Sequence, residues 1–364
     1  MTSVQLVSVT LALLLLAVSV LGAVIVTGRS VRRARQRRDA RLAAEVRPLL
    51  IRLTGGDEDV EEVLRRLAAL DRRRWNAVRA SAVGLLGKVS GQGNAALTRL
   101  FEERGVARDA VADLSRRGSV RRARAATVLG LLRHAEAVPD LTRLLADRHP
   151  EVRTAAARAL GRIAEPQAAG PLLDCLAGGR VPSDVVVQAL IAIGPAARPA
   201  LTKAMAHTAP EVRAIAAEVL GLIGSVGSVS ALIRALTLDP SSDVRTRAAR
   251  SLGRLGTPAC LDALTDAVGL TYPTAVRAEA AGALGDVGAP AAVPALRALL
   301  ADHHYRVAHH AARSLTRLGG PGTETLREAA DGALGVRAAA HAREALAVLA
   351  LAEGRHPARP APAP

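Results

Sequence analysis

Hydrophobic residues recur along most of the chain at a spacing that predicts a series of similar helical units. A leucine that usually precedes a glycine is found at Leu86, Leu129, Leu160, Leu190, Leu220, Leu252, Leu284, Leu315 and Leu346. After a first interval of 43 residues, the intervals lie between 30 and 32 residues. A fixed period in this range is typical of a solenoid, in which every repeat is one supersecondary unit.

The dipeptide Val-Arg is a second repeated feature. It is found at Val78-Arg79, Val120-Arg121, Val152-Arg153, Val212-Arg213, Val244-Arg245, Val276-Arg277 and Val336-Arg337. The pair is missing near residue 182, although the leucine period continues there. We therefore expect a degenerate repeat at that place and not a break in the array.

Each repeat is predicted to contain two helices. The first resembles Ala137–Asp147, AVPDLTRLLAD, with a proline near its start, where a missing N–H costs little. The second contains the recurring leucine. With Leu160 at zero on a helical wheel, Val152, Ala156 and Ile163 fall within about 80° on one side. A single hairpin cannot bury such an apolar stripe, so the pattern predicts an all-α solenoid of stacked hairpins.

Glycines mark two further positions in each repeat. One set follows the second helix and predicts its C-terminal stop: Gly194, Gly224, Gly256, Gly288 and Gly319. Another set lies inside the last turn: Gly130, Gly161, Gly221, Gly253 and Gly285. We expect neighbouring helices to approach closely at this second set, because a bulky side chain would push the stack apart.

The repeated text resembles a known family. The runs Pro139–Pro166, PDLTRLLADRHPEVRTAAARALGRIAEP, and Pro294–Pro321, PALRALLADHHYRVAHHAARSLTRLGGP, resemble HEAT repeats, and in particular the short kind that is also seen in bilin-lyase-like proteins. The resemblance covers roughly residues 57–350. It implies that the second helices line the concave surface of the array.

The resemblance also implies a hydrogen-bonded ladder between an aspartate after the first helix and the arginine of the second. Asp147 with Arg153 and Asp239 with Arg245 match this pattern, six residues apart. Arg153 lies seven residues before Leu160, about 20° from it on the wheel, and is therefore predicted to face the packing interface in a structural role. Two positions depart from the pattern, His207 in place of the aspartate and Ala308 in place of the arginine.

An uncharged segment at the start of the chain predicts a membrane anchor. Residues 4–27 contain no Asp, Glu, Lys or Arg. At about 1.5 Å per residue, a helix of this length reaches about 36 Å, enough to cross a hydrocarbon core of about 30 Å. A cleaved signal peptide would begin with a basic segment and have a shorter apolar core, which does not fit this sequence.

A basic cluster follows the uncharged segment: Arg29, Arg32, Arg33, Arg35, Arg37, Arg38 and Arg41. By the positive-inside rule, the N-terminus is predicted outside and the remainder of the chain in the cytoplasm, as a single-pass protein of the plasma membrane. The cluster is expected to serve as a topology signal. It also suits attraction to anionic lipid, at about 1 kcal/mol per residue near the surface.

Composition and charge refine this division of the chain. The formal net charge is +16, and residues 29–135 hold 25 Arg and Lys against 12 Asp and Glu. The two cysteines form no disulfide framework and are interpreted as small packing residues. The predicted parts are an anchor over residues 1–28, a basic juxtamembrane linker over 29–56, the solenoid over 57–350 and a disordered Pro/Ala tail over 351–364.

Exposed arginines on the second helices are the candidate binding residues. Arg158 and Arg162 lie about 160° to either side of Leu160, on the solvent face. The equivalent positions in two other repeats are Arg250, Arg254, Arg313 and Arg317. These six side chains could form basic stripes in the groove, suited to an acidic protein segment or to phosphate. The alternative is an ordinary solvated face, since Glu218, Leu222, Gly282 and Asp286 interrupt the pattern.

No set of residues predicts catalysis, a cofactor or a metal. The adjacent pairs His303-His304 and His309-His310 diverge on a helix, and the chain has no His-Glu dipeptide of the kind used by HEAT-like di-iron hydroxylases. The sequence therefore favours a bacterial, membrane-anchored cytoplasmic scaffold that binds proteins, such as envelope machinery, and no enzyme. The alternatives are a HEAT-like lyase or hydroxylase, or a basic binder of nucleic acid or anionic lipid. Nucleic acid is the less expected partner.

Overall fold

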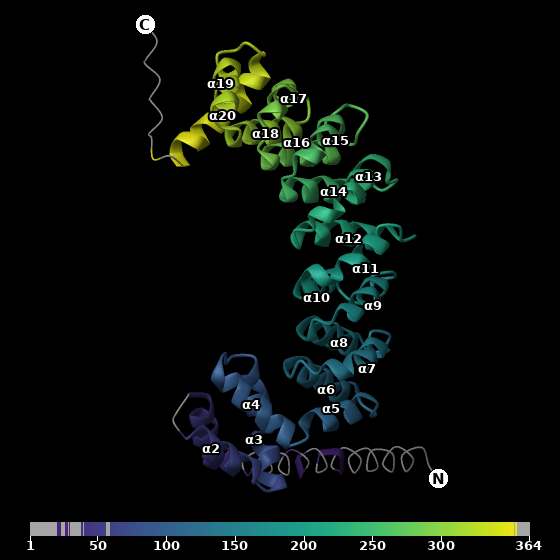
Figure 1. The fold of residues 1–364 in the computed structure, drawn as a ribbon, viewed down its shortest axis with the longest axis vertical. Helices are drawn as coiled ribbons and strands as arrows, with labels where there is room; N and C mark the ends of the chain where they lie inside the picture. Colours follow the sequence, from purple (N-terminus) through teal and green to yellow (C-terminus); the bar gives the residue numbers. More distant parts are fainter. Residues whose placement is uncertain are drawn as a thin grey trace, which may run out of the picture. The chain divides into compact units, whose positions relative to one another are not determined.

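The computed structural model describes residues 20–22, 26, 27, 29, 38, 40–55, 59–352 and 354 (Figure 1). All regular elements among these residues are helices, so the all-α prediction is confirmed. The chain divides into two compact units, residues 1–110 and 111–364. Each unit has its own core and is described separately.

Unit 1 contains the aromatic core of the protein. Its helices are residues 40–55, α2 (Val60–Ala68), α3 (Arg72–Leu86), α4 (Gln92–Glu103) and most of α5 (Val106–Leu114), which continues into unit 2. Trp75 and Phe101 meet edge to face, with ring centroids 5.8 Å apart. The guanidinium carbon of Arg104 lies 4.8 Å from the centroid of the Trp75 ring and its Nη2 donates to the Leu70 carbonyl at 2.7 Å. This core thus uses the single tryptophan and the single phenylalanine of the chain.

Unit 2 is a stack of helical hairpins in sequence order (Figure 1). Its first helices are α7 (Val138–Leu144), α9 (Ala169–Asp174), α11 (Arg198–Ala204), α13 (Val229–Leu238), α15 (Leu261–Ala267), α17 (Val293–Leu299) and α19 (Gly319–Ala330). Its second helices are α6 (Ser119–Leu131), α8 (Pro150–Ile163), α10 (Ser183–Ile193), α12 (Pro210–Leu222), α14 (Ser242–Leu255), α16 (Thr274–Val287), α18 (Tyr305–Arg317) and α20 (Val336–Ala352). The degenerate repeat near residue 182 is helical as expected, because it forms α10.

The second helices make up one face of the stack and the first helices the other (Figure 1). In most of the stack, adjacent second helices pack against each other far more extensively than adjacent first helices do. Closer spacing on one side curves a stack toward that side. The second-helix face is therefore the concave face of unit 2, as the resemblance implied.

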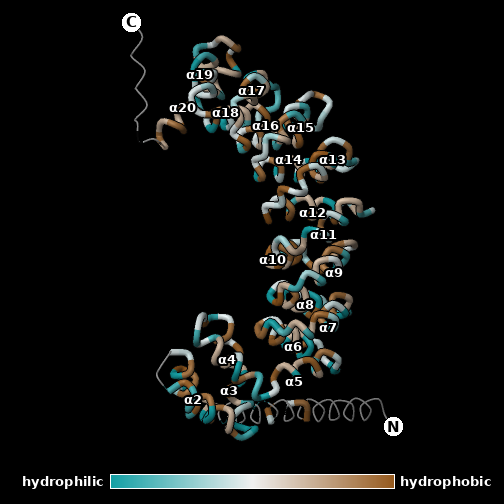
Figure 2. Tube along the Cα trace, viewed as in Figure 1, coloured by the Kyte–Doolittle hydropathy of each residue, from teal (hydrophilic) through white to brown (hydrophobic). Residues whose placement is uncertain are grey.

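The core of unit 2 consists mainly of Ala, Leu and Val. The recurring leucines from Leu129 to Leu315 are fully buried, and so are Val152 and Val212. Figure 2 shows hydrophobic and hydrophilic segments alternating along the helices of the stack. Each hairpin thus covers the apolar stripe of its neighbours, which is the arrangement that the 30–32-residue period predicts.

Two of the Val-Arg pairs named above do not mark a repeat. Val120 is 62 % exposed and Val336 is 90 % exposed, unlike the buried valines of the other pairs. In α6 the arginine seven residues before the recurring Leu129 is Arg122, one position after the dipeptide. The distance to the buried leucine therefore defines the repeat position, because it fixes the direction of the side chain on the helix.

Glycines allow the second helices to meet, as predicted. A Cβ atom placed on Gly161 would lie 2.6 Å from the Cα of Ala189, and one on Gly253 would lie 2.7 Å from the Cα of Ala283. Gly221 faces Ser251 of the next second helix in the same way. The fully buried hydroxyl of Ser251 donates across the same contact to the Ala217 carbonyl at 2.8 Å. The close-approach prediction is thereby confirmed.

The contact between α10 and α12 is an exception. Ile191 stands where neighbouring second helices have this glycine, and Val219 stands where the partner helix has Ala or Ser. These two helices pack less extensively than any other adjacent pair of second helices from α6 to α20. The other contacts from α6 to α18 join glycine to a small residue at this position, so the two bulky side chains here keep the helices apart.

The apolar stretch predicted to cross the membrane lies almost entirely outside the described residues. Within the described part, only Ser183–Ala204 is long and apolar enough for a span, and 39 % of its apolar window is buried. That stretch includes α10 and α11, whose Val186, Leu190 and Leu201 belong to the solenoid core. Its apolar character is therefore explained by packing within the repeat. The tail predicted over 351–364 also lies mostly outside the described residues.

Candidate functional site

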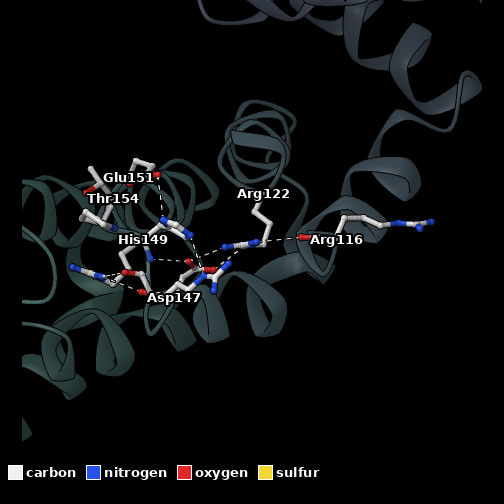
Figure 3. Close-up of polar contacts among 9 residues, drawn as sticks. Arg116, Arg122, Asp147, His149, Glu151 and Thr154 are labelled. Carbon is white, nitrogen blue, oxygen red and sulfur yellow. Dashed lines mark hydrogen bonds and ion pairs between the residues drawn. The ribbon is translucent and has the colours of Figure 1, made fainter. Parts of the chain in front are cut away.

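Paired side chains link one repeat to the next beside the second helices. Arg122 of α6 donates from Nε and Nη2 to the two carboxylate oxygens of Asp147, at 2.8 and 2.9 Å (Figure 3). Asp147 also accepts from the backbone N–H of His149 at 2.9 Å. Arg277 and Asp302 form an equivalent pair, as do Arg213 and Asp239. In all three pairs the aspartate belongs to the repeat after that of the arginine.

The arginine six residues after each aspartate was predicted to bind its carboxylate. This is wrong, because the arginine binds the main-chain carbonyl of that aspartate instead. Arg153 donates from Nη1 to the main-chain carbonyl of Asp147 at 2.9 Å, and Arg245 donates from Nε to that of Asp239 at 2.6 Å. The carboxylates are already occupied by arginines of the preceding repeat. The ladder is thus structural, as predicted, but it joins neighbouring repeats.

Where the next repeat has no aspartate, the arginine finds another partner. Arg153 donates from Nε to the carbonyl of Arg180 at 2.6 Å. The guanidinium carbon of Arg245 lies 5.9 Å from the centroid of the Tyr272 ring. These contacts hold both arginines beside the loops of the array.

The ladder shifts the acidity of its aspartates. Burial by itself would raise the pKa of Asp239, but the hydrogen bonds from Arg213 and from the Ser241 N–H outweigh it, so the pKa is lowered. The balance is the same for Asp147, with Arg122 and the His149 N–H as donors. Both carboxylates are therefore charged at neutral pH and hold arginines in fixed positions.

The six predicted groove arginines all lie on the second-helix face, but in different settings. Arg250 is half-buried and contacts Glu279 of α16 at 2.6 Å, and Arg317 contacts Asp286 of α16 at 2.6 Å. The exposed residues Arg158, Arg162, Arg254 and Arg313 form no ion pair with any described residue. Glu279 and Asp286 thus neutralise two of the six predicted arginines, and the other four guanidinium groups are exposed to solvent.

Two grooves on this face are lined by the exposed arginines that form no ion pair. One, of about 280 Å³, is lined by Arg250, Arg254, Arg313 and Arg317 together with Glu279, Asp286 and His310. The other, of about 440 Å³, lies between α8 and α10 and is lined by Arg158, Arg162 and also Arg133. Sequence reasoning did not find Arg133, because it follows α6 instead of lying within a second helix. Its place four residues after Leu129, where the repeats from Leu190 to Leu315 have glycine, was the available signal.

The histidines and cysteines do not assemble a reactive centre within the described ranges. No group of three or more His, Cys, Asp or Glu side chains there could hold a metal ion. Burial lowers the pKa of His310, which favours the neutral ring. Both cysteines are buried and free, as expected for packing residues, and burial raises the pKa of Cys175 to about 11.

Only part of the predicted membrane-surface cluster is described. Arg29, Arg38 and Arg41 are exposed. The remaining members, Arg32, Arg33, Arg35 and Arg37, lie outside the described residues. The proposed lipid contact of this cluster therefore stays a prediction.

Stacked hairpins joined by an inter-repeat ladder define an α-solenoid repeat protein. The family model for HEAT repeats matches residues 114–194, 196–273 and 270–347. The chain belongs to the HEAT-repeat family. No curated protein matches its sequence significantly.

Several solved structures are similar to this chain. Kap121p is 15 % identical with a TM-score of 0.52, over 87 % of this chain and 42 % of Kap121p. The karyopherin Kap121p bound to the SUMO protease Ulp1p is 14 % identical with a TM-score of 0.53, over 79 % of this chain and 38 % of that one. Human deoxyhypusine hydroxylase is 21 % identical with a TM-score of 0.31, over 76 % and 96 % of the two chains. At these identities, the two Kap121p matches show the fold alone.

Proposed function

We propose that this protein is a membrane-tethered scaffold that binds protein partners on the second-helix face and carries out no catalysis. The observation that supports it most directly is the row of open arginines on the concave face of unit 2. Arg158, Arg162, Arg254 and Arg313 are exposed and form no ion pair with a described residue. Unpaired guanidinium groups on a rigid concave surface suit the recognition of carboxylates.

The rigidity of that surface also supports binding. The ladder and the glycine contacts fix the backbone positions of successive second helices. A surface that is ordered before binding loses less conformational entropy when a partner docks. One protein of similar fold, the karyopherin Kap121p, is seen bound to a protein, the SUMO protease Ulp1p. The proposal extends protein binding to this chain.

The tether is proposed from the sequence. The uncharged residues 4–27, followed by the arginine cluster that begins at Arg29, favour a single span with the N-terminus outside and the solenoid in the cytoplasm. The full chain is then expected to stay with membranes in alkaline carbonate, and a variant without residues 1–28 is expected to be released. Release of the full chain by carbonate would contradict the tether.

A photo-crosslinking amino acid placed on the two faces would test partner binding. The probe replaces Arg254 on the second-helix face, or Arg297 on the first helix α17, in the full chain in native membranes. Arg254 is expected to give discrete protein adducts, and Arg297 is the matched control because it is also an exposed arginine. Adducts that are equal from both positions, or absent from Arg254, would contradict binding on this face.

The absence of catalysis is part of the proposal and has its own measurement. The purified chain is expected to contain no stoichiometric metal by elemental analysis and to show no visible absorption. Stoichiometric iron would favour a hydroxylase of the HEAT-like type instead. A bound chromophore would favour a lyase.

A further inference from the structure

The groove between α8 and α10 brings together three arginines from two repeats. Arg158 and Arg162 lie one turn apart on α8, and Arg133 lies just after the end of α6. The opposite wall is formed by α10 and includes Val185, Gln188, Ala189 and Ala192. One side of the groove is thus cationic, while the other presents apolar groups, one amide and the carboxylate of Asp184.

The charge of this groove is not balanced from within. The only carboxylate that lines it is Asp184, and no described acidic residue forms an ion pair with Arg133, Arg158 or Arg162. In the groove around α16, by contrast, Glu279 and Asp286 each hold one arginine by a hydrogen-bonded ion pair. The α8–α10 groove therefore keeps its guanidinium groups available for an external anion.

The backbone at Arg133 points to a role beyond packing. Arg133 has φ +50°, in the left-handed region that disfavours residues with a Cβ. Later repeats place glycine four residues after the recurring leucine, at Gly194, Gly224, Gly256, Gly288 and Gly319, all with positive φ. An arginine at this position is conformationally unfavourable, and what it adds is a guanidinium group at the groove.

Ala164 offers an internal comparison. It occupies the same position in the next repeat, also lines the groove, and has φ +63°. It therefore carries a similar backbone strain but adds no charge. Strain and charge at this site can thus be separated by experiment.

We propose that the α8–α10 groove binds an acidic segment of a partner protein, with carboxylates on Arg133, Arg158 and Arg162 and small apolar side chains against α10. This assignment rests on the proposed function, because it names the partner chemistry of the same face. The apolar wall beside the cations fits a peptide better than a bare phosphate chain. The volume of about 440 Å³ has room for a few side chains.

The test is the binding of a fluorescein-labelled peptide of alternating Glu and Ala to the full chain in nanodiscs of neutral lipid, followed by anisotropy. Arg133→Gly is expected to weaken binding by about fivefold to tenfold, the loss of one charge-assisted hydrogen bond. The same variant is expected to unfold at an equal or higher temperature, since glycine relieves the left-handed strain. Ala164→Gly relieves a similar backbone strain in the same groove without removing a charge, so it should lower the peptide affinity much less than Arg133→Gly does.

Several outcomes would overturn the assignment. The first is failure of the wild-type chain to bind the peptide. The second is equal peptide affinity of Arg133→Gly and wild type. The third is a loss of affinity in Ala164→Gly as large as that in Arg133→Gly. Tighter binding of an oligothymidylate, weakened by Arg133→Gly, would replace the protein segment with nucleic acid. Crosslinks from the Arg254 position without peptide binding would overturn this inference alone. Peptide binding without those crosslinks would support this groove and contradict the proposed function.

Discussion

Arg213 and Asp239 join two successive repeats through a pair of hydrogen bonds, from Nε to Oδ2 at 2.7 Å and from Nη2 to Oδ1 at 2.9 Å. Their side chains are only 12 % and 7 % exposed. Arg213 also donates from Nη1 to the His207 carbonyl at 2.8 Å. One guanidinium group therefore ties the loop of its own repeat to the loop of the next, and sets their relative position.

Removal of the charge on Asp239 is expected to destabilise unit 2. In Asp239→Asn, the Arg213 guanidinium loses its anionic partner while it stays largely buried. We expect the free energy of unfolding in urea to fall by about 2–4 kcal/mol. Asp243→Asn is the control, because Asp243 is 60 % exposed and its pair with Arg247 is a surface one, so its loss should stay below about 1 kcal/mol. Equal losses would contradict an energetic role for the ladder.

The same pairs predict a loss of stability in acid. The pKa values of Asp147, Asp239 and Asp302 are lowered in the folded protein, since hydrogen bonds from arginine and backbone N–H groups outweigh their burial. A lowered folded-state pKa adds stability that is complete above the unfolded value of about 4 and is lost as the pH falls below it. Urea unfolding measured from neutral pH downward should show this fall. Asp239→Asn should show a shallower one.

Substitution of a contact glycine is expected to separate two second helices. In Gly253→Ala, the new Cβ would meet the Cα of Ala283 at 2.7 Å, which backbone atoms cannot relieve without movement. We expect a loss of about 1–3 kcal/mol by the overpacking mechanism. Gly170→Ala in α9 is the control, because a Cβ there has nothing within 4 Å, and it should be neutral or mildly stabilising. A stable Gly253→Ala protein would mean that the stack spreads easily.

The joint between α10 and α12 is expected to open before the other second-helix contacts. Ile191 and Val219 stand where the other joints from α6 to α18 have a glycine and a small residue, and these helices pack less extensively. Local opening is favoured where buried contacts are few. Native-state hydrogen exchange should therefore show two cooperative blocks within unit 2 that meet at this joint. Uniform exchange through α8, α10, α12 and α14 would argue against it.

Cys175 is expected to be unreactive in the folded protein. Its thiol is buried, and burial raises its pKa to about 11, so little thiolate forms at pH 8. A colourless disulfide reagent at that pH should modify it only after denaturation. Fast modification of the folded chain would show that the C-terminal end of α9, which Cys175 caps, opens readily.

The repeat architecture could be predicted from residue spacing because it depends on local periodicity. Leu160 and Leu220 hold the same position in hairpins that are two repeats apart, and so both face the core. Gly161 and Gly221 mark the points at which neighbouring second helices touch. These features follow from helix geometry and steric size alone. The exposed positions of Arg158 and Arg254 followed from the same wheel.

Only the tertiary structure decided which charged groups meet. Asp147 lies six residues before Arg153 in sequence, yet its carboxylate binds Arg122 of the preceding repeat, because stacking brings the two loops together. The pairs of Arg250 and Arg317 with the acids of α16, and the entry of Arg133 into the α8–α10 groove, likewise depend on the spacing between repeats. Sequence period determines which face a side chain takes, whereas the packing of neighbouring hairpins determines what that side chain contacts.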